Sequence, residues 1–268
     1  MTQLCVLLKS LLESQLWKFT FSWCSRPSVR TIQRRLFKSG LKSFRAARKP
    51  LLSPKNIWDR IAFCRKYESW TPDQWKKVIF SDETSICQFY STVSRVRRPV
   101  GQRYNEKFVT HTVKNAPKVM IWGAISGSGR CGLWFMPPGT TINGAVYLEI
   151  LKEKVPPFIA IYGCTHFQHD GAPCHQTKPV GAWLQQNGIA QLGPWPGNSP
   201  DLNPIEHCWV LLKKKVAYRN PTSIPALCDA IKHVWVTEIG PEYCEKLCLS
   251  MPDRIAAVLR NSGKHTKF

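Results

Sequence analysis

The pattern of apolar residues in the first part of the chain is helical. Val29, Ile32 and Leu36 recur at intervals of three and four residues, which places them on one face of a helix. Ser28 is a suitable cap for the first turn of that helix. A second apolar pattern of the same period follows before residue 70. We therefore expect residues 28–76 to contain short helices joined by a basic linker with prolines.

From residue 77 the pattern becomes that of strands, and later of alternating strands and helices. Longer stretches of helical spacing alternate with two short strands, and the last part of the chain is mostly helical. This combination indicates a mixed α/β or α+β domain over residues 77–268. In its first half, short apolar runs bounded by Gly, Pro and polar residues predict strands over residues 77–83, 85–90, 118–126 and 132–139.

Three acidic residues stand at the ends of predicted elements. Asp82 follows the apolar run of the first strand, and Asp170 follows a later short strand. Glu206 lies in the first turn of a helix that Asn203 and Pro204 begin. Open α/β sheets bind ligands outside the carboxyl ends of their strands. The three carboxylates are therefore candidates for one shared site.

Each acid also has a local explanation. Asn203 and Glu206 match a capping box, in which the Glu side chain bonds the backbone of the cap residue. Asp82 and Asp170 match turn residues that bond nearby amides. Spacing alone does not choose between these local roles and one site.

The donor types indicate which metal a shared site would bind. Carboxylate oxygens without a regularly spaced Cys/His cluster suit Mg²⁺ or Mn²⁺ rather than zinc. Three like charges brought together are costly without a cation, so a converged set of acids implies a metal. Two such ions support the in-line displacement of a phosphodiester.

Four residues near the acids are left out of this set. Glu83 adjoins Asp82, but strand alternation turns its side chain to the opposite face. His169, His175 and His207 lie close to the acids in sequence, yet their spacing matches no common zinc motif. We expect these histidines to position a scissile phosphate or to make structural hydrogen bonds.

The net positive charge of the chain indicates what kind of partner it binds. The formal net charge is +21, with a sequence pI of about 9.8, and the excess of basic residues is greatest in residues 26–77. Such a field favours a polyanion, and nucleic acid is the first candidate. An acidic membrane surface is the alternative, but no amphipathic basic helix stands out. No apolar run is long enough to span a bilayer. The residues that we expect to contact DNA are Arg30, Arg34, Arg35, Lys38, Lys42, Arg45, Arg48 and Lys49.

The helix over residues 28–40 also has a simpler explanation. A solvated surface helix with one basic side accounts for its pattern as well as insertion into a DNA groove does.

The tryptophans indicate core positions, and the cysteines indicate the redox environment of the protein. Trp122, Trp195 and Trp209 are expected to be core residues rather than platforms for stacked bases. The 11 cysteines include no CxxC pair. Reduced thiols in a cytosolic or nuclear protein are the expected consequence.

Four motifs together resemble the Tc1-like branch of the Tc1/mariner transposases: FSDE, KVMIWGAIS, QHDGAPCH and WPGNSPDLNPIEHCW. The resemblance runs from about Ser28 to near the C-terminus. It implies an RNase H-like catalytic domain in which Asp82, Asp170 and Glu206 are the catalytic residues and bind two Mg²⁺ or Mn²⁺ ions. Such an enzyme cuts the inverted-repeat ends of its element and joins the 3′-hydroxyl to a TA target, so a nuclear location is expected. The 35 residues between Asp170 and Glu206 are one more than the commonest spacing in that branch.

The front of the chain departs from the family pattern. Members carry two helix-turn-helix units before the catalytic domain, whereas here only residues 28–41 resemble one, the last helix of the second unit. Residues 1–27 resemble no part of the family and are left unassigned. We therefore expect residues 28–76 to be a remnant helix-turn-helix segment with a basic linker. Transposition would then be impaired by the loss of most of the end-recognition module.

Two other functions are compatible with the same residues. One is a catalytically silent, transposon-derived protein that only binds DNA, and the other is a generic RNase H-like nuclease. The resemblance also implies a clamp loop that helps such enzymes to form a homodimer, although a solvated basic loop explains the pattern equally well. Its basic residues are Arg95, Arg97, Arg98 and Arg103.

Overall fold

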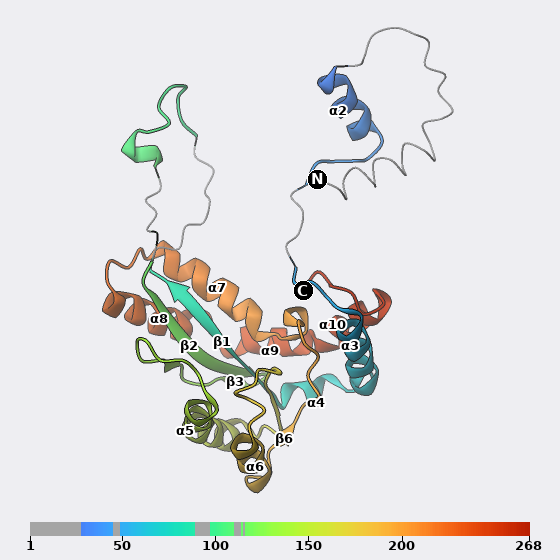
Figure 1. The fold of residues 1–268 in the computed structure, drawn as a ribbon, viewed down its shortest axis with the longest axis vertical. Coiled ribbons are helices and arrows are strands. Elements are labelled where there is room, and N and C mark those ends of the chain that lie inside the picture. The colour runs from blue at the N-terminus through green and yellow to red at the C-terminus, as the bar shows by residue number, and fades with distance from the viewer. Residues whose placement is uncertain (1–27, 45–48, 89–96, 110–113, 115) are drawn as a thin grey trace. The chain divides into compact units, whose positions relative to one another are not determined.

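The computed structural model describes residues 28–44, 49–88, 97–109, 114 and 116–268, and the chain divides into two units, residues 1–48 and 49–268. In the first unit, helix α2 spans Val29–Lys38 (Figure 1). Ser28 caps it as predicted, because its Oγ accepts a hydrogen bond of 3.2 Å from the backbone N–H of Thr31. None of the residues of α2 is buried. The unassigned segment 1–27 lies outside the described residues.

The second unit is built on a sheet whose described part has six strands. The strand order is β3-β2-β1-β5-β6, with β4 also paired to β2. Strands β1 and β2 are antiparallel, whereas β1, β5 and β6 are parallel to one another. The bounds are β1 Val78–Cys87, β2 Lys118–Ser126, β3 Gly129–Arg130, β4 Trp134–Phe135, β5 His166–Gln168 and β6 Ala190–Gln191.

One prediction about these strands is wrong. The two strands expected over residues 77–83 and 85–90 are a single strand, β1, as far as the structure describes them. Its polar centre does not interrupt it, because β2 pairs with it continuously from Phe80 to Cys87. Asp82 consequently lies in the middle of a strand and not at its end.

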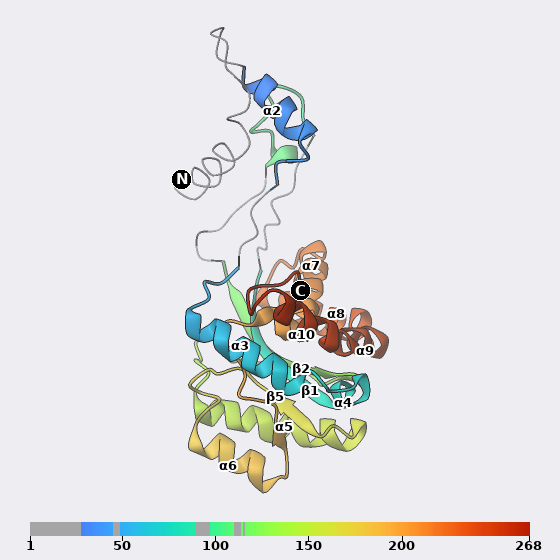
Figure 2. The ribbon, with the colours of Figure 1, turned by 90° about the vertical axis from the view of Figure 1, so that its right-hand side faces the viewer.

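Helices cover both faces of the sheet, as Figures 1 and 2 show. Helices α5 and α6 pack on one face, and α3, α4 and α7–α10 pack on the other, each over its own apolar core. The bounds are α3 Pro54–Tyr67, α4 Pro72–Lys76, η1 Glu106–Phe108, α5 Gly144–Tyr162, α6 Lys178–Gln186, η2 Pro200–Leu202, α7 Ile205–Tyr218, α8 Ile224–Glu238, α9 Pro241–Leu249 and α10 Met251–Arg260.

Strand β1 divides its side chains between the two cores. Phe80 and Ile86 belong to the core under α7, whereas Ile79 belongs to the core under α5 and α6. Successive side chains of a strand point to opposite faces. Asp82 therefore shares the α7 face with Phe80, and Glu83 shares the opposite face with Ile79.

The second compact unit begins at Lys49, whereas the predicted catalytic domain begins at residue 77. The difference arises from α3 and α4, whose Phe63, Tyr67 and Trp75 are buried in the same core as β1. In the part of the chain that the structure describes, every cysteine is free. No helix there is long and apolar enough to cross a membrane.

Candidate active site at the end of the parallel strands

Asp82 and Asp170 occupy equivalent positions on neighbouring chain segments. The parallel pairing of β1 with β5 ends at Phe80 and Gln168, and each aspartate follows its strand's last paired residue by two positions. Ser81 closes this end, since its N–H and Oγ donate to the Gln168 side chain and carbonyl at 3.2 and 2.8 Å. Asp82 is thus at the end of the parallel pairing, although its own strand continues along β2.

Glu206 does not form the capping box that its spacing suggests. The backbone N–H of Asn203 donates to Pro200 O at 3.1 Å, so it is not available to the Glu206 carboxylate. The helix α7 instead starts at Ile205, with Pro204 as its cap residue. The Asn203 side chain donates to Ser81 O at 3.3 Å, which holds the start of α7 against β1. The local explanation for Glu206 is therefore wrong, and its carboxylate is left for another role.

Asp82 and Glu206 face each other across the α7 side of the sheet. Both side chains are half-buried. Loss of surrounding water raises the pKa of Asp82 well above its usual value, and the nearby charges of Glu206 and Glu83 raise it further. Loss of water also raises the pKa of Glu206. Both carboxyls therefore keep their protons to a higher pH than exposed carboxyls do, although the charge of Lys213 offsets part of the rise at Glu206.

Asp170 has a different environment. It is exposed, and its Oδ1 accepts from Ala172 N at 2.9 Å and lies 2.7 Å from His175 Nδ1. These bonds, chiefly that to His175, lower the pKa of Asp170. Within the described residues, no group of three or more Asp, Glu, His or Cys is arranged to hold a metal ion. The structure thus brings Asp82 and Glu206 together, and it leaves Asp170 bonded to His175.

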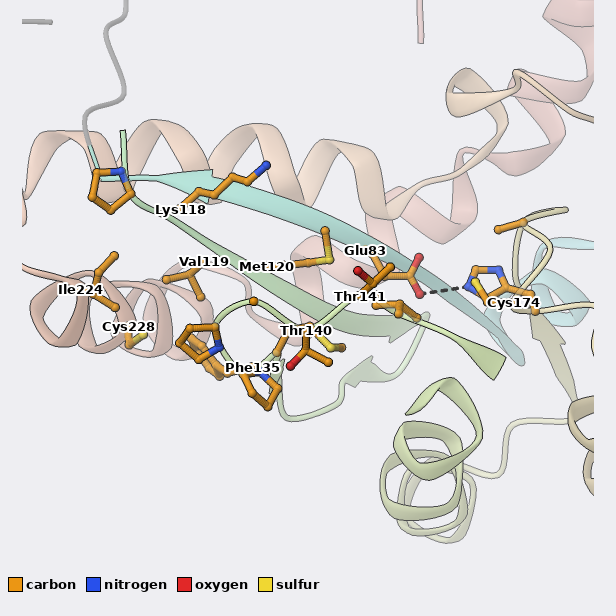
Figure 3. A pocket seen from close by; sticks show the side chains of 18 residues that line it. Glu83, Lys118, Val119, Met120, Phe135, Thr140, Thr141, Cys174, Ile224 and Cys228 are labelled. Atoms are coloured by element: carbon orange, nitrogen blue, oxygen red, sulfur yellow. Dashed lines mark hydrogen bonds and ion pairs between the residues drawn. The ribbon is translucent and has the colours of Figure 1, made fainter. Parts of the chain in front are cut away.

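His175 links Asp170 to Glu83. Its Nε2 lies 3.1 Å from Glu83 Oε1 (Figure 3), so the ring bridges two carboxylates. Burial would lower the pKa of His175, but its bonds to Asp170 and Glu83 raise it to about 10. Alternation along β1 correctly turned Glu83 away from Asp82. This bridge was not predicted, because Glu83 and His175 are 92 residues apart.

The other two histidines, His169 and His207, have lowered pKa values. The His169 ring stacks on His175 with a centroid distance of 5.3 Å, and its Nδ1 is 3.2 Å from Tyr147 Oη. Burial, together with the charge of His175, lowers the pKa of His169 to about 4. Burial also lowers the pKa of His207. The bond of His169 to Tyr147 agrees with the expected structural role, whereas the bond at His207 is one from Tyr243 to its backbone carbonyl.

The turn that precedes α7 is fixed by a buried ion pair that sequence reasoning missed. Arg60 of α3 donates two hydrogen bonds of 2.7 Å to the Asp201 carboxylate, and both residues are buried. Arg254 of α10 donates to the backbone carbonyl of Asp201 at 2.7 Å. The partners are distant in sequence, so no local motif announces them. Together they hold the segment that delivers Glu206.

Two openings flank the aspartate end of the sheet. A cavity of about 980 Å³ has mostly apolar walls from β2 and from residues 135–142, and Glu83 and His175 line it (Figure 3). A second cavity of about 470 Å³ lies beside Asp170 and is lined by polar residues such as Gln176 and Thr177. The first cavity thus reaches Glu83, and the second reaches Asp170.

The basic residues expected to contact DNA are accessible where the structure describes them. Arg30, Arg34, Arg35 and Lys38 are exposed on α2, and Lys42 and Lys49 are exposed beyond it. Lys49 donates to Phe268 O at 2.9 Å. Arg45, Arg48 and the loop residue Arg95 lie outside the described residues. The other three loop arginines, Arg97, Arg98 and Arg103, are exposed.

Comparisons with known proteins agree with this geometry. The family model described as "DDE superfamily endonuclease" matches residues 77–228, and a second model, a helix-turn-helix described as "Transposase", matches residues 24–69. The chain is 34% identical to the Tc1 transposase of Caenorhabditis elegans over 90% of the chain and 89% of that protein. It is 33% identical to the Tcb2 transposase of Caenorhabditis briggsae with the same coverage.

Solved structures show the same fold at low sequence identity. The Mos1 transposase paired-end complex with left transposon end matches 97% of this chain and 79% of that one, with a TM-score of 0.80 and 18% identity. The catalytic domain of Mos1 mariner transposase matches 82% of this chain and the whole of that one, with a TM-score of 0.60. The RNase H-like fold expected from the sequence motifs is confirmed.

Proposed function

The chain belongs to the Tc1/mariner family of transposases, and from that premise we propose that Asp82, Asp170 and Glu206 are its catalytic, metal-binding residues. Membership makes it a DDE-type transposase and endonuclease that acts in DNA transposition. The observation that carries the proposal is the closeness of Asp82 and Glu206, since the charge of Glu206 helps to raise the pKa of Asp82. The pKa of Glu206 is raised as well, and the nearby charge of Lys213 offsets only part of that rise. Asp170 occupies the equivalent position on the adjacent strand.

The donor set suits divalent magnesium or manganese. All three residues offer hard carboxylate oxygens, which Mg²⁺ and Mn²⁺ prefer. Asp170 keeps its Oδ2 free of hydrogen bonds from the described residues, while its Oδ1 is held by Ala172 and His175. A cation beside Asp82 and Glu206 would offset the charges that now repel each other. Solved Mos1 catalytic domains have been obtained with Mg and with Mn.

Two ions held by these carboxylates would supply Lewis-acid stabilisation to the attacking and leaving oxygens of an in-line displacement. The chain's own residues orient the reaction. Asn203 anchors α7 to β1 and so sets the distance between Glu206 and Asp82. Water first breaks a phosphodiester at the element end and leaves a 3′-hydroxyl, and that hydroxyl then attacks a phosphodiester of the target and releases its 3′-oxygen.

DNA is the partner that the basic residues favour. The Mos1 complexes contain transposon-end DNA, and we extend inverted-repeat ends and a TA target to this chain. The exposed arginines of α2 would contact phosphates and so position the DNA without reading its sequence. A homodimer assembled through the loop of Arg97, Arg98 and Arg103, and a nuclear location, complete the proposal.

Weakened end recognition is also part of this proposal. The helix-turn-helix family model matches residues 24–69, which is wider than the residues 28–41 expected from the motif. The proposal therefore rests on the family pattern of two such units, of which one is matched here. Fusing a full end-recognition module to the chain tests it. Cleavage that rises only in the fusion supports weakened recognition, whereas equal cleavage by both proteins contradicts it.

The decisive experiment measures metal-dependent cleavage of terminal-repeat DNA by the full chain. We expect cleavage in Mg²⁺ or Mn²⁺, none in a chelator, and loss of cleavage in Asp82→Ala, Asp170→Ala and Glu206→Ala. Glu153→Gln is the control, since its carboxylate is exposed and pairs only with neighbouring Lys154. Equal nicking by the wild type and Asp170→Ala would identify a contaminant, and DNA binding without cleavage would favour the silent DNA-binding alternative. Cleavage of RNA–DNA hybrids in preference to terminal repeats would favour the generic nuclease.

A further inference from the structure

Trp209 donates a hydrogen bond to a proposed metal ligand. Its Nε1 is 2.9 Å from Asp82 Oδ2. Trp209 follows Glu206 by three residues on α7, and residues at this spacing share a helix face. The same face of α7 therefore brings both the Glu206 carboxylate and an indole N–H to Asp82. We had expected Trp209 to be only a core residue, and its burial is nearly complete at 1% exposure.

The indole ring of Trp209 packs against the backbone of a glycine in strand β2. Gly123 of β2 lies directly opposite Asp82 in the strand register. A Cβ on Gly123 would lie 2.8 Å from Cη2 of Trp209 and 3.0 Å from Cδ2 of Leu133. Real Cβ atoms do not approach this closely, so the ring occupies space that only glycine leaves. The absence of a side chain at residue 123 thus lets the indole reach the carboxylate opposite.

A second tryptophan fixes the ring from the side. Trp235 of α8 stacks on Trp209 with a centroid distance of 5.3 Å and an interplanar angle of 24°. The N–H of Trp235 donates to Cys131 O at 2.8 Å, which holds Trp235 in turn. Trp209 therefore has no freedom to move its N–H away from Asp82 without disturbing the core.

An indole N–H suits this place chemically. It is a donor only and carries no charge, so it binds one carboxylate oxygen without neutralising the group. A Lys or Arg in its place would satisfy Asp82 as a counter-ion and compete with a metal. Trp209 is the only side-chain donor to Asp82 among the described residues, and Oδ1 receives no side-chain hydrogen bond from them. The backbone N–H of Glu83 also acts on this carboxyl.

We propose that Trp209 is a positioning residue that holds Asp82 Oδ2 and thereby orients Oδ1 toward a divalent cation. The proposal rests on the role of Asp82 as a metal ligand, put forward above. Partners that orient a ligand typically contribute 10- to 100-fold to metal affinity. Loss of the N–H should therefore weaken metal binding while leaving the fold and DNA binding in place.

The test is a Mn²⁺ titration of the full chain without DNA, in which electron paramagnetic resonance reports the free ion. We expect Trp209→Phe to weaken Mn²⁺ binding by about 10-fold. Trp75→Phe is the matched control, because it also shortens a fully buried tryptophan ring, and the Trp75 N–H has no hydrogen-bond partner among the described residues. It should stay within about 2-fold of the wild type. Thermal unfolding and metal-free DNA binding establish that each variant is folded.

The results distinguish an error in the role of Trp209 from an error in the proposed metal site. Equal Mn²⁺ affinity in Trp209→Phe and the wild type, or equal weakening in both tryptophan variants, overturns the positioning role. An Asp82→Ala variant that binds Mn²⁺ like the wild type, or a wild type that binds none, overturns the proposed metal site and the inference with it. Loss of binding in Asp82→Ala alone leaves the metal site standing and removes only the role of Trp209.

A measurement on the native residue covers the case in which Trp209→Phe does not fold. In chain labelled with ¹⁵N-tryptophan, Mg²⁺ should shift one indole N–H signal strongly, and that shift should be absent in Asp82→Asn. An indole spectrum that Mg²⁺ leaves unchanged, in a wild type that binds the ion, contradicts the proposal.

Discussion

Two adjacent carboxylates on β1 have opposite electrostatic environments. Asp82 faces α7, where Glu206 is another acid and the nearest donor is the uncharged indole of Trp209. Glu83 faces the other side of the sheet, where His175 bridges it to Asp170 and carries a raised pKa of about 10. On the Glu83 face a cationic imidazole compensates the negative charge. On the Asp82 face the charge of Lys213 offsets only part of the raised pKa of Glu206. The comparison shows where the protein itself supplies a cation and where it leaves room for one.

The largest effect should come from removing the uncompensated charge. Asp82→Asn keeps the shape of the side chain but loses its charge, so we expect terminal-repeat cleavage to fall by at least about 1,000-fold, equivalent to several kcal/mol of transition-state stabilisation. Its metal-free thermal midpoint should rise, since the repulsion with Glu206 disappears. Cleavage assays and thermal unfolding in a chelator measure the two effects. Normal cleavage by Asp82→Asn would contradict the proposal that the Asp82 charge is needed for the reaction.

A third carboxylate, that of Asp201, shows how much a fully paired charge contributes to the free energy of unfolding. Asp201 is buried against Arg60, and breaking such a pair costs about 3–5 kcal/mol. We expect Arg60→Met to lower the free energy of unfolding in urea by this amount. The control is Lys55→Ala, which removes the exposed Lys55–Asp59 pair and should cost less than about 0.5 kcal/mol. Similar costs for the two variants would contradict the buried role of Asp201.

The bridge on the Glu83 face should be pH-dependent. Folding raises the pKa of His175 from 6.5 to about 10, so its stabilisation is fully present below pH 6.5 and is lost as the pH rises through 10. We expect His175→Gln to cost about 1.5–3 kcal/mol at pH 6, and less as the pH approaches 10.

The stacked neighbour His169 supplies a control for this prediction. Its pKa is lowered from 6.5 to about 4, so between pH 8 and pH 10 the ring is neutral in both the folded and the unfolded protein. The stability difference between His169→Gln and the wild type should therefore stay constant over this range. Parallel pH profiles for the two histidine variants would show that His175 is not a charged bridge.

The smallest expected effect concerns the Asp82–Glu206 pair in the intact protein. Both pKa values are raised, so the pair's stabilisation is present below pH about 4 and is lost as the pH rises through the folded pKa values. The thermal midpoint of the metal-free wild type should fall relative to Asp82→Asn over this rise. At neutral pH, Mg²⁺ at ten times its dissociation constant should restore about 1.4 kcal/mol. A Mg²⁺ effect of equal size in Asp82→Asn would place the ion elsewhere.

Local patterns predicted much of the fold. Helix α2 begins at Ser28 as expected, and β2 spans the residues 118–126 predicted for it. The sequence pattern gave the wrong strand bounds where pairing with a neighbouring strand decides how far a strand extends. The polar centre of β1 looks like a break between two strands, but pairing with β2 makes it one. Propensity is a local quantity, and continuous pairing with a neighbour overrides it.

The sequence by itself determined which residues are candidates for chemistry and to which sides of β1 Asp82 and Glu83 point. Asp82, Asp170 and Glu206 were identified from their places in predicted elements, and alternation alone separated Glu83 from Asp82. Only the tertiary structure decided the surroundings of these residues. It excluded the capping box, because Asn203 N–H is already bonded to Pro200 O, and it placed His175 beside Glu83 and Trp209 over Gly123. Such contacts depend on packing between segments far apart in the chain, and no local period encodes that packing.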